Sequence, residues 1–255
     1  MITSFMRGGL GNQMFQYAYA RCLSVQYNME FYLDVKNYTH PLELRSFTLS
    51  EFPNLNLKFN STLSPGTQTI SDSFNHINQV LDQTKNYYLE GYWQSEKYFK
   101  DCEQIIKEDF SYDDKTELLL LGKYPQLSTN TISLHVRRGD YLTSNGAHPI
   151  QTIEYYEKSV NIIGEYDYIF IFSDDITWCK ENLKFPSMVF VEGNTDVQDL
   201  WCMSLCKNNI IANSSFSWWA AWLNRNDSKV VVSPQRWFGL PLNTSNIIPQ
   251  EWYNI

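Results

Sequence analysis

The segment from Ile132 to Tyr141 reads ISLHVRRGDY. Its first half has apolar residues at alternate positions and no proline, which is typical of a strand inside a sheet. Arg137 and Arg138 follow directly, at the kind of strand end where open α/β sheets bind ligands. A guanidinium matches phosphate oxygens with two parallel hydrogen bonds. The segment therefore predicts a strand that ends at an anion site. A solvated strand end with a simple Arg–Asp pair is the alternative.

The same kind of pattern continues through the second half of the chain. Short apolar runs alternate with helical patterns, which is typical of a parallel, doubly wound sheet. Thr195 to Gln198 is a capping-box signature before one of the helices. The expected strands are residues 131–136, 168–172, 188–191, 209–212 and 229–232, and the expected helices are residues 152–163, 175–183, 195–206 and 215–224.

A loop rich in hydroxyl side chains precedes the last of these helices. It consists of Asn213, Ser214, Ser215, Phe216 and Ser217. The N–H groups at a helix N-terminus, together with the helix dipole, attract anions. Serine is also a common N-cap that needs no ligand. Arg137 and Arg138 (the arginine turn) follow a strand of the same predicted sheet. We therefore expect the loop and these two arginines to bind a diphosphate together.

A third strand end carries Ser173, Asp174 and Asp175. Ser173 or Asp175 suits a helix cap, and Asp174 suits either a loop contact or a ligand contact. Two aspartates also suggest the metal-binding DxD motif of some glycosyltransferases. Here the two are adjacent, so they point in different directions, and two arginines are available to neutralise phosphate. We therefore expect no metal.

The first forty residues predict a β–turn–α–β unit, with strands at residues 2–6 and 31–35 and a helix from about residue 12 to residue 27. The turn contains Gly9-x-Gly11 of the dinucleotide fingerprint, but Met14 occupies the position of the third glycine. Asp34 lies at the spacing of a ribose-binding carboxylate. A NAD-dependent oxidoreductase is therefore an alternative. Farther along, we expect a strand at residues 87–93 and a helix from Ser95 to about residue 107.

Composition limits the class of protein and its partners. A hydrophobic content of 43% with 19% charged residues indicates an ordinary globular protein. A net charge of −8 argues against a nucleic-acid partner or an anionic membrane surface. The sequence contains neither a signal-peptide pattern nor an apolar run long enough to span a membrane. The five cysteines have no CxxC spacing, and we expect core thiols in a reducing compartment.

Five segments of the chain, taken in order, resemble the α-1,2-fucosyltransferase family. They are residues 8–18 (GGLGNQMFQYA), 91–99 (GYWQSEKYF), 135–141 (HVRRGDY), 172–175 (FSDD) and 210–224 (IIANSSFSWWAAWLN). The resemblance implies a GT-B-like α/β fold with two Rossmann-type domains facing a cleft. We expect an acceptor-side domain at residues 1–125 and a donor-binding domain at residues 126–255, with the boundary in a polar, turn-rich stretch.

The resemblance also implies roles for individual residues. Arg137 matches the residue expected to bind the donor β-phosphate and stabilise departing GDP. His135 and Asp199 match positions that contact guanosine, and residues 214–217 match the loop around the diphosphate. Arg138 either contacts the donor or braces the motif.

The general base is less defined. Asp140 either serves as the base or orients an arginine. Asn12 lies in the glycine-rich segment, and Asp34 and Glu90 are further candidates. The sequence does not choose among them.

The resulting hypothesis is an inverting, metal-independent transferase without a resident cofactor. It moves L-fucose from GDP-fucose, its donor substrate, to the 2-hydroxyl of a terminal galactoside in a glycan acceptor. We expect it in the cytoplasm, or at the periphery of a membrane where glycans are assembled. A non-catalytic sugar- or nucleotide-binding module and the oxidoreductase are the alternatives.

Overall fold

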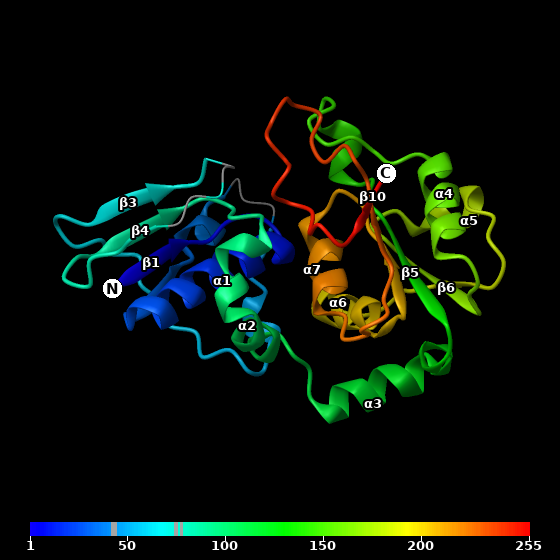
Figure 1. Ribbon diagram of the computed structural model, residues 1–255, viewed down its shortest axis with the longest axis horizontal. Helices are drawn as coiled ribbons and strands as arrows, with labels where there is room; N and C mark the ends of the chain where they lie inside the picture. The colour runs from blue at the N-terminus through cyan, green and yellow to red at the C-terminus, as the bar shows by residue number, and fades with distance from the viewer. Residues whose placement is uncertain (42–44, 74–75, 77–78) are drawn as a thin grey trace. The chain divides into compact units, whose positions relative to one another are not determined.

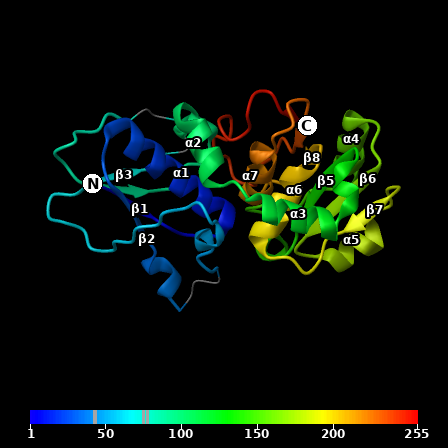
Figure 2. The same cartoon turned by 90° about the horizontal axis from the view of Figure 1, so that it is seen from below.

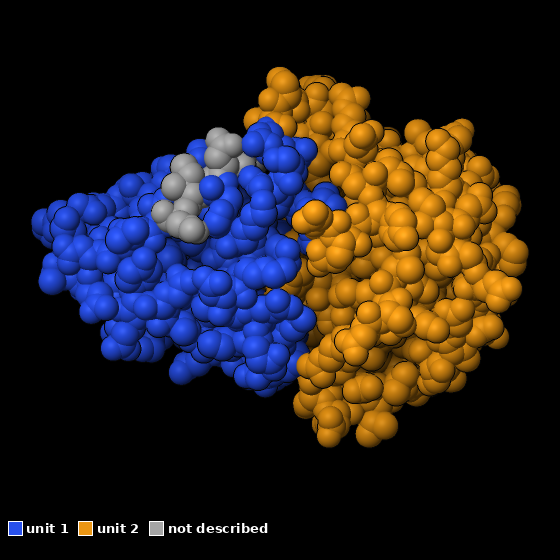
Figure 3. Space-filling view, in the orientation of Figure 1, with its two compact units in different colours: residues 1–111, 243–249 blue, residues 112–242, 250–255 orange. Residues whose placement is uncertain are grey.

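The computed structural model describes residues 1–41, 45–73, 76 and 79–255. The chain forms two compact units, coloured separately in Figure 3: unit 1 is residues 1–111 with 243–249, and unit 2 is residues 112–242 with 250–255. Each unit is an α/β fold, and every strand pairing among the described residues is parallel. The division falls at residue 111 instead of residue 125 because helix α3 (Asp114–Lys123) packs with unit 2. Lys123 at its end donates to the carbonyl oxygens of Glu192 and Gly193, each at 3.3 Å.

Unit 2 contains a six-stranded sheet in the order β10-β9-β8-β5-β6-β7. The strands are β5 (Thr131–Val136), β6 (Tyr168–Ser173), β7 (Met188–Phe190), β8 (Asn208–Ile210), β9 (Val231–Ser233) and β10 (Tyr253–Asn254). From β5 the chain proceeds outward through β6 and β7, then returns to the other side of β5 as β8. The strand order therefore reverses between β5 and β8.

Helices cover both faces of this sheet (Figure 1, Figure 2). They are α4 (Ile153–Ile163), α5 (Ile176–Asn182), α6 (Asp196–Leu205) and α7 (Ser215–Leu223). Because side chains alternate along a strand, Ile132 and Leu134 of β5 pack into a core with residues of α4 and α5. Ser133 and His135 point to the opposite face, where His135 meets Ser217 of α7. The predicted doubly wound arrangement of this half is confirmed.

Unit 1 contains a four-stranded sheet in the order β2-β1-β4-β3. Its strands are β1 (Ile2–Phe5), β2 (Phe31–Asp34), β3 (Gln68–Ser71) and β4 (Tyr87–Glu90). Helix α1 (Leu10–Tyr27) connects β1 to β2 and buries Met14, Phe15, Ala18 and Cys22 completely. Here the strand order reverses between β1 and β4.

The expected helix from Ser95 to residue 107 is interrupted. Two 3₁₀ turns, η3 (Glu96–Tyr98) and η4 (Lys100–Cys102), precede the shorter α2 (Glu103–Asp109). The expected strand at residues 87–93 ends at Glu90, and Trp93 has a φ of 55°, in the left-handed region that ends extended structure. The remaining 3₁₀ turns are η1 (Lys36–Thr39), η2 (Leu49–Glu51), η5 (Pro125–Ser128) and η6 (Asp140–Thr143).

The cysteines follow the prediction in part. Cys179, Cys202 and Cys206 are buried free thiols. Cys22 and Cys102 instead form a disulfide, with their Cα atoms 5.5 Å apart. Eighty residues separate the two in sequence, so only the packing of α1 against η4 reveals the pair.

Tyr155 provides a test of the packing of α4 on the sheet. It is buried, and its hydroxyl donates to the carbonyl oxygen of Ile211 at 2.7 Å and lies 3.2 Å from that of Val232. We expect Tyr155→Phe to lower the free energy of unfolding by about 1–3 kcal/mol, because buried carbonyls lose their partner. Guanidinium denaturation measures the change. Tyr253→Phe, at a half-exposed position, should stay within about 0.5 kcal/mol of the wild type. Equal effects of the two substitutions would contradict this account of α4.

Candidate functional site

Arg137 lies directly after β5, at the point where the strand order of unit 2 reverses. Its Nη2 pairs with Asp140 Oδ1 at 2.6 Å, and its Nη1 pairs with Asp174 Oδ2 at 3.0 Å. The guanidinium carbon also lies 5.5 Å from the ring centre of Tyr141. The Asp140 side chain is 54% exposed and the Asp174 side chain 25%. Asp140 is therefore the more accessible of the two carboxylates that hold Arg137.

The residues after β6 support the arginine turn. Ser173 Oγ accepts the N–H of Asp175 at 2.9 Å, and Asp175 Oδ1 caps α5 by accepting the N–H of Trp178. Asp175 Oδ2 pairs with Arg138 Nε at 3.0 Å, while Asp174 Oδ1 accepts the backbone N–H of Arg138 at 2.9 Å. The Arg138 guanidinium carbon lies 4.1 Å from the ring centre of Trp178. These contacts favour the bracing role for Arg138.

Gly139 allows this close approach. A Cβ at position 139 would lie 2.5 Å from Asp174 Oδ2, a distance at which the carboxylate must move. A side chain at position 139 would therefore force the Asp174 carboxylate, the partner of Arg137, to shift.

The loop before α7 lies beside the arginine turn. His135 Nδ1 is 2.9 Å from Ser217 Oγ, and the Tyr141 hydroxyl donates to the carbonyl oxygen of Asn213 at 2.8 Å. Ser214, the N-cap residue of α7, makes no capping hydrogen bond with its side chain. In contrast, the other helices of unit 2 are capped by Asp113, Thr152, Asp175 and Thr195. Plain N-capping by serine is thus not what this loop does, and the first turn of α7 contacts His135, two residues before Arg137.

The first turn of α7 also contacts His135. Ser215 and Phe216 are half-buried, and the Phe216 ring centre lies 5.8 Å from that of His135. Burial and the charge of Arg137 hold the pKa of His135 well below its ordinary value. The imidazole is therefore neutral at pH 7, and only one of its nitrogens carries a proton.

Asp199 lies on α6 in a different environment. Its Oδ1 accepts from Asn194 Nδ2 at 2.8 Å, and burial raises the pKa of Asp199 to about 6. The charges that act on this pKa are those of Asp196 and Lys123, not that of Arg137. The predicted contact of Asp199 with guanosine stays a prediction.

Two of the base candidates in unit 1, Asp34 and Asn12, differ in accessibility. Asp34 is fully buried: its Oδ2 pairs with Lys36 Nζ at 2.9 Å and accepts from the Tyr88 hydroxyl at 3.0 Å. These are the contacts of a carboxylate that fixes its strand end. Asn12, in the first turn of α1, is half-buried, and its Oδ1 accepts from Gln94 Nε2 at 2.7 Å.

Two residues near the arginine turn gave no signal in the sequence. The His148 ring stacks on that of Tyr141 with centres 4.7 Å apart, and Gln151 Nε2 donates to Asn213 Oδ1 at 3.0 Å. Burial lowers the pKa of His148, with a smaller contribution from the charge of Arg137. The segment between them and the motif resembles an ordinary polar loop in sequence, so only the folded contacts reveal them.

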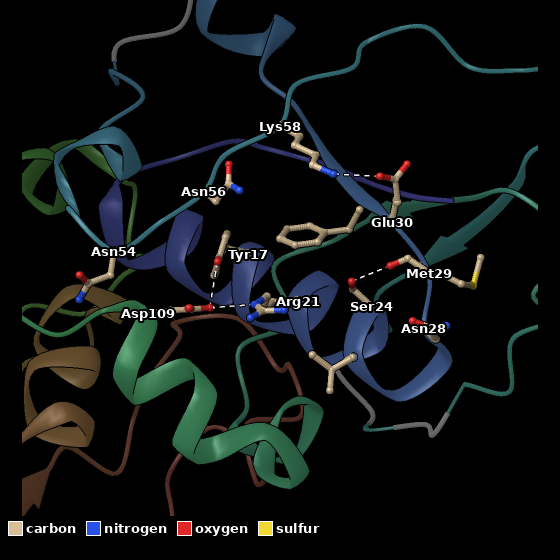
Figure 4. Close-up of a pocket in the computed structure, with 12 residues that line it drawn as sticks. Tyr17, Arg21, Ser24, Asn28, Met29, Glu30, Asn54, Asn56, Lys58 and Asp109 are labelled. Carbon is tan, nitrogen blue, oxygen red and sulfur yellow. Dashed lines mark hydrogen bonds and ion pairs between the residues drawn. The ribbon is translucent and has the colours of Figure 1, made fainter.

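A cavity of about 600 Å³ lies in unit 1 (Figure 4). Its charged side chains neutralise one another, since Arg21 pairs with Asp109 at 3.0 Å and Lys58 with Glu30 at 2.9 Å. The Tyr17 hydroxyl also donates to Asp109. None of the residues predicted for the site lines this cavity.

The described residues show neither a metal-binding cluster nor a helix that could span a membrane. Within them, no group of three or more His, Cys, Asp or Glu side chains is arranged to hold a metal ion. Among the helices of the described part, none combines the length and apolar character needed to cross a bilayer.

The fold is shared with solved glycosyltransferases. The fucosyltransferase NodZ from Bradyrhizobium superposes with a TM-score of 0.57 at 14% identity, over 86% of this chain and 91% of that protein. At this identity the likeness concerns the fold, which is that of the two-domain, Rossmann-like GT-B glycosyltransferases.

The sequence comparisons define the family. Residues 1–255 match the model of glycosyl transferase family 11, and the chain belongs to that family. An α-1,2-colitosyltransferase of Escherichia coli is 34% identical over 293 residues, covering 100% of this chain and 99% of the relative. A galactoside α-(1,2)-fucosyltransferase 1 of Aotus azarae is 24% identical over 163 residues, covering 55% of this chain and 43% of the relative. The predicted resemblance to the α-1,2-fucosyltransferase family is confirmed, and the oxidoreductase alternative loses its support.

Gly139→Ala tests the role of the close approach. We expect the rate of glycosyl transfer to fall at least about tenfold, equivalent to about 1.4 kcal/mol, because the new Cβ displaces Asp174 from Arg137. Steady-state kinetics measures the rate, and thermal unfolding checks the fold. Gly122→Ala is the matched control, since a Cβ there meets nothing within 4 Å. A fully active Gly139→Ala protein would show that the pairing does not matter.

The buried imidazole of His135 makes stability depend on pH. Its folded pKa is depressed, so the unfolded chain binds the proton more tightly and stability falls as the pH drops below the unfolded value of about 6.5. From pH 6.5 to 5.5 the wild type should lose about 1 kcal/mol relative to His135→Asn, which lacks the titrating group. Denaturation of both proteins at each pH measures this difference. Parallel pH profiles would contradict a neutral, buried His135.

Proposed function

We propose that this protein is an inverting α-1,2-fucosyltransferase that uses GDP-fucose. One observation supports the proposal above the others: at the switch point of the unit 2 sheet, His135 contacts Ser217 in the first turn of α7, which has no side-chain cap, and Arg137 follows His135 by two residues at the end of β5. A guanidinium and free helix N–H groups together suit a diphosphate. The proposal gives the donor to unit 2 and the acceptor, a terminal galactoside of a glycan, to unit 1.

In this reaction an acceptor hydroxyl attacks C1 of fucose from the side opposite GDP. The new C–O bond forms as the bond from C1 to the β-phosphate oxygen breaks, and the electron pair of that bond remains on GDP. Negative charge therefore grows on the diphosphate, where preorganised donors have the largest effect on the rate. Arg137 and the N–H groups of residues 215–217 supply these donors. Metal independence and a cytoplasmic location remain predictions.

The ion pairs of Arg137 indicate the order of steps when the donor binds. Before the donor binds, Asp140 and Asp174 hold the guanidinium in place. The diphosphate then replaces Asp140, the more exposed of the two, while Asp174 continues to orient Arg137. Asp140, no longer paired with Arg137, then acts as the general base and accepts the proton of the acceptor hydroxyl.

A second candidate is transfer of colitose, the sugar in the name of the relative at 34% identity. A screen of nucleotide sugars by thermal shift, followed by NMR of the product linkage, separates the two. A stronger response to GDP-fucose and an α-1,2 linkage in the product support fucosyl transfer. Binding of a donor without turnover would instead indicate a binding module.

Arg137→Ala tests the assignment directly. Loss of one preorganised donor to a developing oxyanion typically lowers kcat by about 10²–10³, or roughly 3–4 kcal/mol. We expect a loss of that size in GDP-fucose turnover with the fold intact. Arg225→Ala removes an exposed arginine of the same unit and should retain full activity. Turnover of Arg137→Ala near the wild-type rate would remove the basis of the proposal.

A further inference from the structure

Unit 1 has a second polar cluster, at the carboxyl ends of β1 and β4. The strand order of its sheet reverses between these two strands, the position where open α/β sheets bind ligands. Arg7 follows β1, and Tyr92 and Gln94 follow β4. The guanidinium carbon of Arg7 lies 4.6 Å from the ring centre of Tyr92. A cation over an aromatic face at the switch point forms the centre of this cluster.

The cluster is held in place from two sides. Gln16 of α1 is fully buried; its Oε1 accepts the backbone N–H of Arg7 at 3.0 Å, and its Nε2 donates to the Arg7 carbonyl oxygen at 3.3 Å. Trp93, which lies between Tyr92 and Gln94 in the sequence, is buried, and its ring centre lies 4.5 Å from that of Tyr19. The backbone on both sides of the cluster is therefore fixed before any ligand binds.

Arg7 has no negative partner within residues 1–41, 45–73, 76 and 79–255. Its Nε is buried and makes no hydrogen bond to a described residue. Other cations of the same unit are paired: Arg21 with Asp109, Lys36 with Asp34, and Lys58 with Glu30. A partly buried guanidinium without a counter-charge is costly, so an anion bound at Arg7 would recover that energy.

Two amide side chains, those of Asn12 and Gln94, lie close to the residues that flank the cluster. Asn12 approaches the residue after Arg7 so closely that a Cβ at Gly8, where φ is +78°, would lie 2.7 Å from Asn12 Nδ2. Gln94 Nε2 donates to Asn12 Oδ1, whereas Gln94 Oε1 is buried without a hydrogen-bond partner among the described residues. A buried amide oxygen without a partner gains free energy when a hydroxyl that reaches it donates a hydrogen bond.

We propose that Arg7 recognises an anionic group, a carboxylate or a phosphate, on the acceptor glycan, while Gln94 Oε1 accepts a hydrogen bond from one of its hydroxyls. This inference rests on the proposed function, because it takes unit 1 as the acceptor side. It narrows the acceptor to an acidic oligosaccharide. Arg7 is then a residue that determines specificity, and it takes no part in the departure of the donor diphosphate.

The experiment compares three disaccharides that end in galactose and differ in the second sugar, which is glucose, glucuronic acid or a glucose phosphate. Binding to the protein saturated with GDP is measured by calorimetry. We expect the wild type to bind at least one acidic form about tenfold or more tightly than the neutral form, as a charge-assisted hydrogen bond allows. Arg7→Gln should abolish that preference and leave binding of the neutral form within about twofold. The two acidic forms identify the source of the charge.

Two variants serve as controls. Arg7→Lys keeps the charge and should retain part of the preference, and Lys58→Gln, which removes a paired cation of unit 1, should retain all of it. Equal binding of neutral and acidic forms by the wild type would overturn the inference. Equal weakening of all three forms in Arg7→Gln, or a loss of GDP affinity, would also overturn it. Failure of the proposed function has a different signature, namely that the wild type transfers sugar from no donor.

Discussion

The ion pair between Arg137 and Asp174 is the interaction on which the site in unit 2 depends. The parallel sheet brings the ends of β5, β6 and β8 to one edge, and each end contributes one part. β5 supplies Arg137, β6 supplies Asp174, and the loop after β8 leads to Ser217. Gly139 allows Asp174 to approach, since a Cβ there would collide with its carboxylate. The sheet topology and Gly139 thus fix the position of the Arg137 guanidinium. Without the contact to Asp174, residues far from Arg137 in sequence would not restrain it.

The proposed binding of an anionic donor by an acidic protein requires a local positive charge. The net charge is −8, so the attraction must be local and oriented. Asp140 and Asp174 keep Arg137 in place without fully enclosing it, and α7 leaves its first N–H groups without a side-chain cap. Unit 1 resembles unit 2 in that α1 also begins without a side-chain cap. The two units differ in that Arg7 makes no ion pair within the described residues. Ion pairs orient Arg137 in unit 2, whereas stacking on Tyr92 orients Arg7 in unit 1.

The local residue pattern predicted the central strand and two of the helix caps of unit 2. β5 was predicted to the residue, and the cap at Asp175 and the capping box at Thr195 were confirmed. β3 and β10 were missed because they are short, exposed edge strands without an apolar alternation. The pairing of Arg137 with Asp174 and the stacking of His148 on Tyr141 join segments that lie apart in the chain, so no local signal announces them. For the same reason the sequence could name candidate bases but could not show that Asp34 is buried and paired.

A crystal structure of the complex with GDP tests the central claim most directly. We expect the β-phosphate to lie within hydrogen-bond distance of the Arg137 guanidinium and of N–H groups in the first turn of α7, with Asp140 displaced from Arg137 and Asp174 still paired with it. GDP bound with its diphosphate away from this edge of the unit 2 sheet, or Arg137 still paired with both carboxylates in the complex, would contradict it.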